Sequence, residues 1–296
     1  MNNKFYIKIR QILLNKIVLT YKINKTLNEQ IKNLKNFGLL EQQLKGGGKI
    51  LTVEYNNETF IFTKLDDEYS TIVTYVLQAK NNDSDCVVIS IDKELNQASI
   101  DNLTTDGLQC SNSIMNNIGS HLIELTIKLL KKYKNKFNIN KILISDHSFL
   151  FCSKAKVNIN LADLYTLKHG IPFYGKFGFI PYDNNPILNI TSTIKSNKTL
   201  NKKFNKNKEI IKTLKVCDSK LLDYLEKFQT KIKYDISKII DYVKQNQNKL
   251  LSEIIKTLSS KDNFENTCEI LNYIIPKLIE RNNLTSFHNK AFEVNI

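Results

Sequence analysis

Tyr174 is the residue whose type and surroundings most directly suggest chemistry. It lies in HGIPFYGKFGFIPY (residues 169–182), where glycines, aromatic residues and a proline are concentrated, although the chain has only 9 Gly and 4 Pro in 296 residues. A phenol has a pKa of about 10, so at neutral pH it can donate a proton to a departing anion. The alternative is a structural role in which the ring packs on a sheet.

A second candidate site lies where a polar loop leads into an amphipathic helix. Backbone N–H groups at a helix N-terminus lack partners, and the helix dipole favours negative charge there. The alternative is that Gly119 and Ser120 only begin the helix. The bulky His121 suits a phosphate site only if its ring points away or bonds the anion itself. The predicted cofactor-binding residues are Asn116, Asn117, Ile118, Gly119, Ser120 and His121.

Asp146 and His147 directly follow an apolar run in ILISDHS. Ligand crevices of open α/β sheets lie outside the carboxyl ends of the strands, so either side chain could accept a proton, directly or through water. The alternative is that Asp146 caps the next segment and His147 lies on the surface. Cys152 is not expected to be a nucleophile, because no His–Asn or His–Asp pairing accompanies it.

The elements that would position these residues follow from hydrophobic periodicity and turn signals. Between residues 49 and 182 the predicted order is strand, strand, helix, strand, strand, helix, strand, helix, strand, which favours an α/β sandwich around a mixed sheet. The predicted positions are hairpins at 50–65 and 85–106, a short helix at 66–80, an amphipathic helix through Ile118, Leu122, Leu125 and Leu129, a strand at 139–145, a helix ending at Gly170, and a turn and strand at 174–182.

The composition changes along the chain predict its domain organisation. Three consecutive glycines end any helix, and a basic, polar stretch begins near residue 195. In the last region we expect helices at roughly 207–231, 233–258 and 264–281, with Pro276 inside the last helix, and a closing strand. The predicted regions are a helical N-terminal segment at 1–45, a Gly46–Gly48 linker, an α/β domain at 49–194, and a basic bridge with a helical C-terminal region at 195–296.

The element order, together with Tyr174, Lys176, Gly178 and Phe179, resembles the GNAT N-acetyltransferase superfamily. Many of its members carry a Tyr-x-Lys-x-Gly-Phe pattern after their last conserved helix. The resemblance implies a mixed, mostly antiparallel sheet flanked by helices, here with helical extensions at both ends. The superfamily's cofactor loop has the pattern Arg/Gln-x-x-Gly-x-Gly/Ala. This chain departs from it, with asparagine at the first position and histidine at the last.

The resemblance implies an acetyl-CoA-dependent N-acyltransferase that acts on an unknown amine. The pyrophosphate of acetyl-CoA would bind at residues 116–121, Tyr174 would protonate the departing thiolate, and Asp146 or His147 would act as the base. The alternative is a catalytically inactive GNAT-like scaffold that serves as a structural or interaction protein. Its C-terminal helices could then pair with a protein partner.

Several longer stretches also resemble uncharacterised proteins of giant nucleocytoplasmic large DNA viruses. They include LADLYTLKHGIPFYGKFGFIP and the N-terminal segment that ends in Gly-Gly-Gly. This resemblance implies a location in the host cytoplasm, at the viral factory, or in the virion.

The formal net charge of +14, from 43 Lys+Arg against 29 Asp+Glu, is compatible with polyanionic partners. The alternative explanation is compositional drift, in which AT-rich codons fill permissive surface positions with Asn, Lys and Ile. Specific nucleic-acid recognition is not expected of residues 195–215, because Phe204 is their single aromatic residue.

The five cysteines are widely spaced, odd in number and without a CxxC pair. We therefore predict no disulfide framework, no structural zinc and a reducing, intracellular location. The four histidines lack metal-ligand spacing, so no metal is expected. No apolar run approaches the roughly 20 residues that a membrane span needs. The N-terminal stretch is interpreted as a basic amphipathic helix, not a signal peptide.

Overall fold

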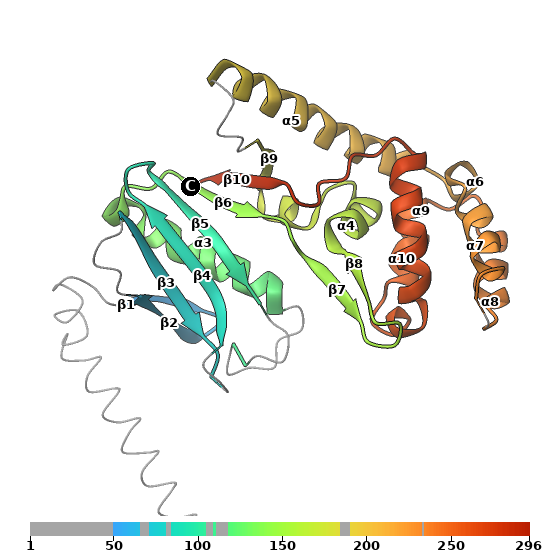
Figure 1. Cartoon of the computed structure of the whole chain (residues 1–296), viewed down its shortest axis with the longest axis horizontal. Helices are drawn as coiled ribbons and strands as arrows, with labels where there is room; N and C mark the ends of the chain where they lie inside the picture. Colours follow the sequence, from blue (N-terminus) through green and yellow to red (C-terminus); the bar gives the residue numbers. More distant parts are fainter. Residues whose placement is uncertain are drawn as a thin grey trace, which may run out of the picture.

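The computed structural model describes residues 50–65, 71–80, 84–104, 109–110, 118–183, 190–232 and 234–296, with the backbone alone over 190–195. The predicted N-terminal helix, the Gly46–Gly48 linker and the candidate residues Asn116 and Asn117 lie outside this part of the chain. Within it, the predicted α/β class is confirmed: an eight-stranded sheet is combined with eight α-helices (Figure 1).

A single large sheet carries the α/β part of the fold. Its strand order is β1-β2-β3-β4-β5-β6-β10-β9. Among the described strands, β5 and β6 are the one parallel pair, and every other neighbouring pair is antiparallel. The strands are β1 Ile50–Tyr55, β2 Glu58–Leu65, β3 Ile72–Gln78, β4 Asp85–Asp92, β5 Gln97–Leu103, β6 Lys141–Ser145, β9 Ile180–Tyr182 and β10 Ala291–Asn295.

Both predicted hairpins are confirmed, as β1–β2 and β4–β5. In the first, Tyr55 pairs with Glu58 across Asn56 and Asn57, whose φ angles are 48° and 60°. A two-residue turn of type I′ needs positive φ at both central positions, and asparagine tolerates that conformation. The twist of this turn matches that of the strands, so the local sequence is sufficient to specify the hairpin.

Strand β3 shows that the helix predicted at 66–80 is wrong over residues 72–78. These residues instead pair with β2 on one side and β4 on the other. The segment Ile72–Gln78 has the sequence IVTYVLQ, so its first five residues are β-branched or aromatic. Such side chains lose rotamer freedom in a helix and pack well on a pleated surface. With a strand edge available on each side, this β propensity prevails over the helix-like spacing of the apolar residues.

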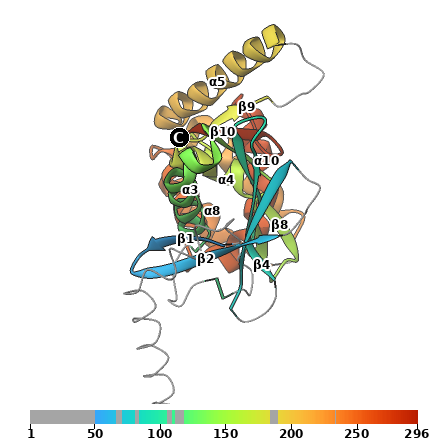
Figure 2. The same ribbon diagram turned by 90° about the vertical axis from the view of Figure 1, so that its left-hand side faces the viewer.

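Helix α3 (Ile118–Phe137) is the predicted amphipathic helix and covers one face of the sheet (Figure 2). Its apolar side is fully buried, and the Phe137 ring lies 5.8 Å from the ring of Tyr75 on β3. The Tyr133 hydroxyl donates to the Thr52 carbonyl oxygen on β1 at 3.3 Å. These contacts fix the helix on the sheet, and with it the position of the first turn of α3.

Helix α4 (Leu161–His169) ends at Gly170, as predicted. The Asn160 side chain caps its start by accepting from the Asp163 N–H at 3.1 Å. Gly170 has φ 76°, and its N–H bonds the Thr166 carbonyl oxygen at 2.7 Å. The predicted turn that follows is a short 3₁₀ helix, η1 (Phe173–Phe177), which leads through Gly178 into β9.

The C-terminal end of the chain returns to the sheet, which confirms the predicted closing strand. β10 lies between β6 and β9 and is antiparallel to both. Its Phe292 is fully buried, with ring centroids 6.1 Å from Tyr174 and 6.2 Å from Phe287. In the sequence, all helices from α5 to α10 therefore come between β9 and β10, two strands that are neighbours in the sheet.

Helix α5 (Ile190–Thr213) replaces the basic bridge that the sequence predicted. Lysine is a good helix former, and the apolar residues Leu200, Phe204 and Ile211 lie on one side of the helix. Leu200 and Phe204 pack on the core of the sheet, whereas Ile211 belongs to a second core built by the later helices. α5 thus connects the two cores. The high charge of the segment had led to the prediction of a polar bridge. The later helices are α6 Val216–Ser219, α7 Leu221–Gln229, α8 Ser237–Gln245, α9 Leu251–Leu258 and α10 Phe264–Arg281.

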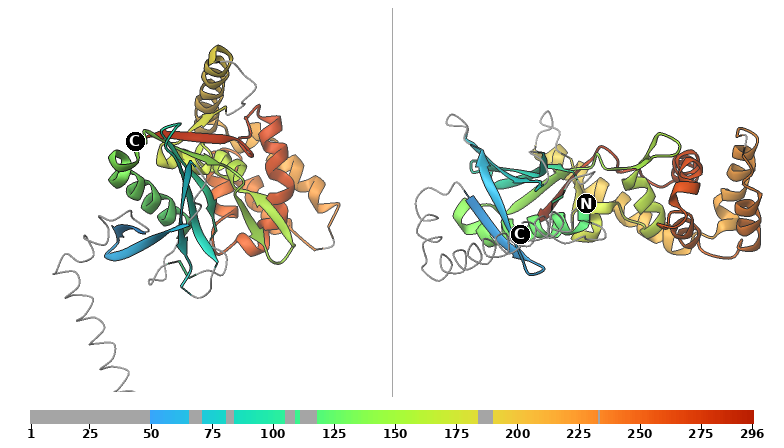
Figure 3. Two further views of the ribbon diagram at one scale, coloured as in Figure 1. Left: turned by 60° about the vertical axis from the view of Figure 1, so that its left-hand side comes forward. Right: turned by 90° about the horizontal axis from the view of Figure 1, so that it is seen from below.

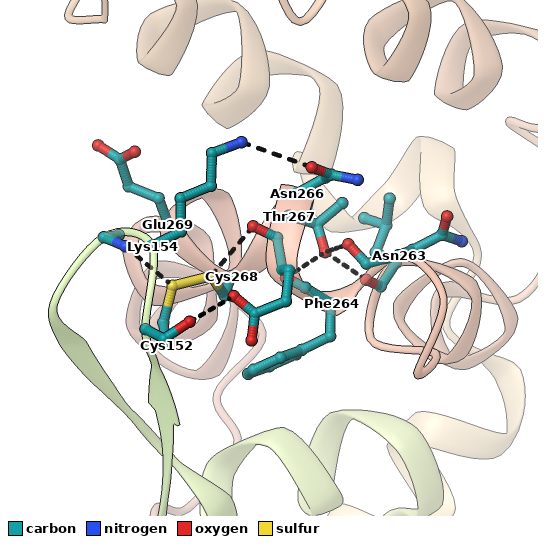
Figure 4. Close-up of a disulfide and its surroundings, with 12 residues drawn as sticks. Cys152, Lys154, Asn263, Phe264, Asn266, Thr267, Cys268 and Glu269 are labelled. Atoms are coloured by element: carbon teal, nitrogen blue, oxygen red, sulfur yellow. Dashed lines mark hydrogen bonds between the residues drawn. A yellow bond between two sulfur atoms is a disulfide. The ribbon is translucent and has the colours of Figure 1, made fainter. Parts of the chain in front are cut away.

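A small hairpin, β7 (Phe149–Cys152) with β8 (Val157–Asn160), follows β6 and was not predicted. It lies beside α10 (Figure 1), to which a Cys152–Cys268 disulfide attaches it (Figure 4). The tip of the hairpin adds polar contacts, with the Ser153 hydroxyl donating to the Glu265 carboxylate at 2.9 Å. The predicted absence of a disulfide framework is therefore wrong.

A second disulfide joins Cys86 on β4 to Cys110, with 5.9 Å between their Cα atoms. Cys217 is the free cysteine and is exposed. The prediction of no disulfide framework rested on the wide spacing of the cysteines. The two bonded pairs are 24 and 116 residues apart in sequence, but folding can bring cysteines at any such separation close enough to bond. Disulfides persist in oxidising surroundings, so the predicted reducing location loses the observation on which it rested.

Candidate functional site at the carboxyl ends of β5 and β6

The first turn of α3 contains four of the predicted cofactor-binding residues, Ile118, Gly119, Ser120 and His121. All four are partly exposed. The helix has no acidic residue in this turn, so the partial positive charge of its N-terminus is not neutralised there. Because α3 begins after β5 and leads into β6, this turn belongs to the carboxyl edge of the parallel pair.

His121 turns its ring towards β1. Its Nδ1 lies 3.0 Å from the hydroxyl of Tyr55, which also donates to the Glu124 carboxylate. Burial raises the pKa of Tyr55 to about 12, and the neighbouring Glu124 adds to the rise. A phosphate site here requires that the His121 ring either points away from the anion or bonds it. In the structure the imidazole points away, towards Tyr55.

Lys176 joins the two sequence motifs. Its Nζ donates to the Ser120 hydroxyl at 2.6 Å, across a sequence separation of 56 residues. The same Nζ lies 4.6 Å from the ring centroids of both Phe173 and Phe177, so the aromatic residues of η1 support the cation. Partial burial lowers the pKa of Lys176, an effect that nearby Glu124 opposes.

More basic side chains surround this lysine. Burial, followed by the charges of Lys256, Lys168 and Lys176, lowers the pKa of His169. Burial and Lys256 likewise lower the pKa of Lys168. These groups come from the end of α4, from η1 and from α9, and they repel one another. An anion bound nearby would relieve that repulsion.

The pairing of β5 with β6 stops short of the end of β5. The last matched residues are Ile100 and Ile144, and in β5 the register towards β4 shifts around Asp101. Beyond that point, Asn102 and Leu103 pair with β4 only, whereas Ser145 pairs with Ala291 on β10. A bulge of this kind bends a strand, so the two parallel strands separate at their carboxyl ends.

Asp146 and Tyr174 meet just beyond that separation. The Asp146 carboxylate is fully buried and accepts from the Ser148 N–H at 3.0 Å and from the Ser148 hydroxyl at 2.5 Å. Burial raises the pKa of Tyr174, the Asp146 charge raises it further, and a hydrogen bond with Ser148 opposes both. Tyr174 is only 6% exposed, and its ring packs edge-on against Phe173 and Phe179.

His147 is not part of this group. It is exposed, and its Nδ1 lies 2.8 Å from the Asn289 side-chain oxygen. Asp146 and His147 directly follow β6, and successive residues of an extended chain point to opposite sides. Of the two predicted bases, Asp146 faces the interior and His147 the surface. Of that pair, the structure brings only Asp146 next to Tyr174.

Asp163, on α4, and His288, in the segment before β10, complete a buried polar cluster that sequence reasoning missed. Both Asp163 and His288 interact electrostatically with Asp146. One signal was available: Asp163 interrupts an otherwise apolar helix face in LADLYTL. Among the described residues, four buried side-chain atoms lack a hydrogen-bond partner, and all belong to this region: Asp146 Oδ2, Asp163 Oδ1, Thr166 Oγ1 and His288 Nδ1.

Burial raises the pKa of both Asp146 and Asp163, and the His288 charge opposes the rise in each. An acid whose pKa is higher in the folded than in the unfolded state stabilises the fold while it is protonated. That contribution is complete below the unfolded pKa of about 3.9 and is lost as the pH rises through the folded pKa.

The free energy of unfolding of Asp163→Asn is therefore expected to rise, relative to that of the wild type, as the pH rises from 4 to 7. The amide keeps the size of the side chain and cannot ionise. The measurement is urea unfolding at pH 4, 5, 6 and 7, with Asp241→Asn at an exposed site on α8 as the control. If the difference in free energy of unfolding between Asp163→Asn and the wild type stays constant with pH, the interpretation of Asp163 as a buried carboxylate is wrong.

Within the part of the chain that the structure describes, no group of three or more His, Cys, Asp or Glu side chains is arranged to hold a metal ion. In the same residues, no helix combines the length and apolar character needed to cross a bilayer.

Comparison with protein-family models, with curated proteins and with solved structures finds no match for this chain.

Proposed function

We propose that this chain binds acetyl-CoA at the carboxyl ends of β5 and β6 and transfers the acetyl group to an amine. The observation that carries the proposal is the hydrogen bond between Lys176 and Ser120. It joins the basic, aromatic η1 segment to the N-terminal turn of α3, at the point where β5 and β6 separate. A helix N-terminus with an adjacent lysine suits a pyrophosphate.

The topology supports a GNAT-like interpretation. The parallel strands β5 and β6 are connected through α3, within an otherwise antiparallel sheet. In the superfamily that the sequence resembles, pantetheine occupies a V-shaped slot between two such strands. The end of pairing after Ile100 and Ile144 is the feature that a slot of this kind requires.

In the proposed reaction, the amine nitrogen attacks the thioester carbonyl carbon. The new C–N bond forms and the C–S bond breaks, so the electron pair of the latter goes to the CoA sulfur. Tyr174 donates its proton to that thiolate, and Asp146 takes the proton lost by the amine. A phenol with a raised pKa stays protonated before the reaction, and a carboxylate with a raised pKa is a stronger base than usual.

A catalytically inactive scaffold is the second candidate function, and the burial of the polar cluster favours it. Tyr174 is 6% exposed and Asp146 is fully buried. Side chains enclosed in this way also serve to hold β6, α4 and the 284–290 segment together. In this case the protein would act as a structural or interaction protein of a DNA virus, as the sequence resemblance suggests.

Calorimetry of the full chain with acetyl-CoA tests the proposal. We expect binding, and we expect Lys176→Ala to weaken it by about tenfold, since a charge-assisted hydrogen bond contributes about 1.5 kcal/mol or more. The control is Lys141→Ala. That lysine lies at the start of β6, at the opposite end from the proposed site, and it also rests on an aromatic ring, that of Tyr182.

Tyr174→Phe separates the two candidate functions. With an acetyltransferase, the variant should bind acetyl-CoA as before but release free CoA thiol at least about a hundredfold more slowly in the presence of a peptide mixture with free amines. Binding without thiol release by the wild type would favour the scaffold. No heat of binding at millimolar acetyl-CoA would refute both the cofactor site and the reaction.

A further inference from the structure

The net charge of this chain is concentrated around α5. Residues 190–220 contain nine lysines and two acidic residues, a net of +7, which is half of the +14 carried by the whole chain. This segment is only about a tenth of the length. A codon bias that acts evenly along the chain would spread the charge, so it does not account for this concentration.

Most of the lysines of α5 whose side chains the structure describes lie on its outward side. Leu200, Phe204, Asn207 and Ile211 face the protein, and Asn207 is fixed there by a hydrogen bond from its side chain to the Thr285 carbonyl oxygen at 2.8 Å. At 100° per residue, Lys198, Lys202, Lys206 and Lys212 occupy the opposite arc of the helix, whereas Lys203 and Lys208 flank the packed side. All six lysines are exposed.

Over the stretches of chain that the structure describes, none of the six lysines forms an ion pair. Glu209 is the single acidic residue of α5. Lys198, Lys202 and Lys206 follow one another at intervals of four, about 6 Å apart along the axis, and like charges at this spacing weaken a helix. A bound polyanion would relieve the repulsion.

The position of α5 leaves this side of the helix open. It runs along the outer edge of the molecule above β9 and β10, and its N-terminal end extends beyond the sheet (Figures 2 and 3). A rigid, straight row of cations is therefore presented to a partner without a change of fold.

We propose that this outward face of α5 binds the phosphate backbone of duplex nucleic acid, independently of sequence. The chemistry of the face selects this partner. It has no aromatic residue, which single-stranded nucleic acid would need for base stacking. Over residues 196–213, where the structure describes the side chains, it has no apolar residue to insert into a lipid surface, because the apolar side of α5 is packed against the protein. What remains is Glu209 together with lysine, asparagine and threonine, and the last three are groups that contact phosphates.

Fluorescence anisotropy with the full chain and two 24-base-pair DNA duplexes of unrelated sequence tests the proposal at 50 to 200 mM salt. Both duplexes should bind with equal affinity. The variant K198Q/K202Q/K206Q should bind about a hundredfold more weakly at 100 mM salt, with a salt slope smaller by about 2.7, because three phosphate contacts are lost. The charge-matched control is K227Q/K249Q/K261Q, at exposed sites on α7 and in the connections before and after α9.

Either of two results would overturn the proposal. One is equal weakening by the two triple variants, which would mean that net charge alone governs binding. The other is loss of sedimentation with phosphatidylserine vesicles by K198Q/K202Q/K206Q while its duplex affinity stays at the wild-type value, which would identify a membrane surface as the partner. Glutamine preserves helix propensity, and matching thermal unfolding curves show that both triple variants fold.

Discussion

Replacing Cys152 and Cys268 by serine is expected to lower the free energy of unfolding by about 5 kcal/mol. The two residues are 116 positions apart, so their disulfide closes a loop that spans more than a third of the chain. A cross-link of this length removes much of the conformational entropy of the unfolded state. It also anchors the β7–β8 hairpin to α10, against the core of the helical region.

The second disulfide provides a matched comparison. Cys86 and Cys110 are 24 positions apart, so the variant C86S/C110S should lose about 3.5 kcal/mol, roughly 1.4 kcal/mol less than the first variant. Cys217→Ser, at the exposed free thiol, should change stability by less than about 0.5 kcal/mol. Guanidinium unfolding without reductant measures all three variants.

If C152S/C268S unfolds like the wild type, the two cysteines are not bridged in solution. The reducing location predicted from the sequence would then regain its support. Mass spectrometry of the alkylated wild-type chain, without prior reduction, gives the same answer independently, because bridged cysteines escape alkylation.

Gly170→Ala is expected to destabilise the fold by about 4 kcal/mol, for two reasons that add. Gly170 has φ 76°, where an alanine is strained by about 1 to 2 kcal/mol. In addition, an added Cβ would lie 2.6 Å from the Lys208 Cα and 3.3 Å from the Lys208 carbonyl oxygen. These are backbone atoms of α5, so the clash forces a helix to move, and such overpacking costs about 1 to 3 kcal/mol.

Gly178→Ala is the matched control for this prediction. Gly178 also has positive φ, 87°, but the nearest atom to its added Cβ is the Val294 Cγ2 at 3.8 Å, an ordinary contact. Only the backbone strain of about 1 to 2 kcal/mol should be observed. Urea unfolding of both variants therefore isolates the contact between the end of α4 and α5. Equal losses would show that α5 does not pack closely on Gly170.

The sequence by itself determined the parts of this protein that depend on neighbours in the chain. The β1–β2 hairpin follows from two asparagines between alternating apolar residues, and α3 follows from an apolar stripe with a period near 3.6. The end of α4 at Gly170 is equally local, because glycine adopts the left-handed conformation without strain. In each case the backbone conformation and the side-chain pattern agree within one element.

Other elements were decided by the tertiary structure. The spacing of the apolar residues in β3 is also compatible with a helix. Pairing with β2 on one side and β4 on the other determines that the segment is a strand. The charge of α5 suggested a bridge, yet the helix is held because its apolar side contacts both cores. Local patterns are ambiguous in such segments, and burial against distant partners removes the ambiguity.

The candidate site likewise combines residues that the sequence pattern predicts with contacts that only the tertiary structure shows. Sequence pattern alone singled out Tyr174, Asp146 and the start of α3, because glycines, aromatics and a strand end are visible in the chain. The contact of Lys176 with Ser120, the approach of Asp163 and His288 to Asp146, and both disulfides depend on segments far apart in sequence. The packing of the whole fold, including the return of β10 between β6 and β9, brings those segments together.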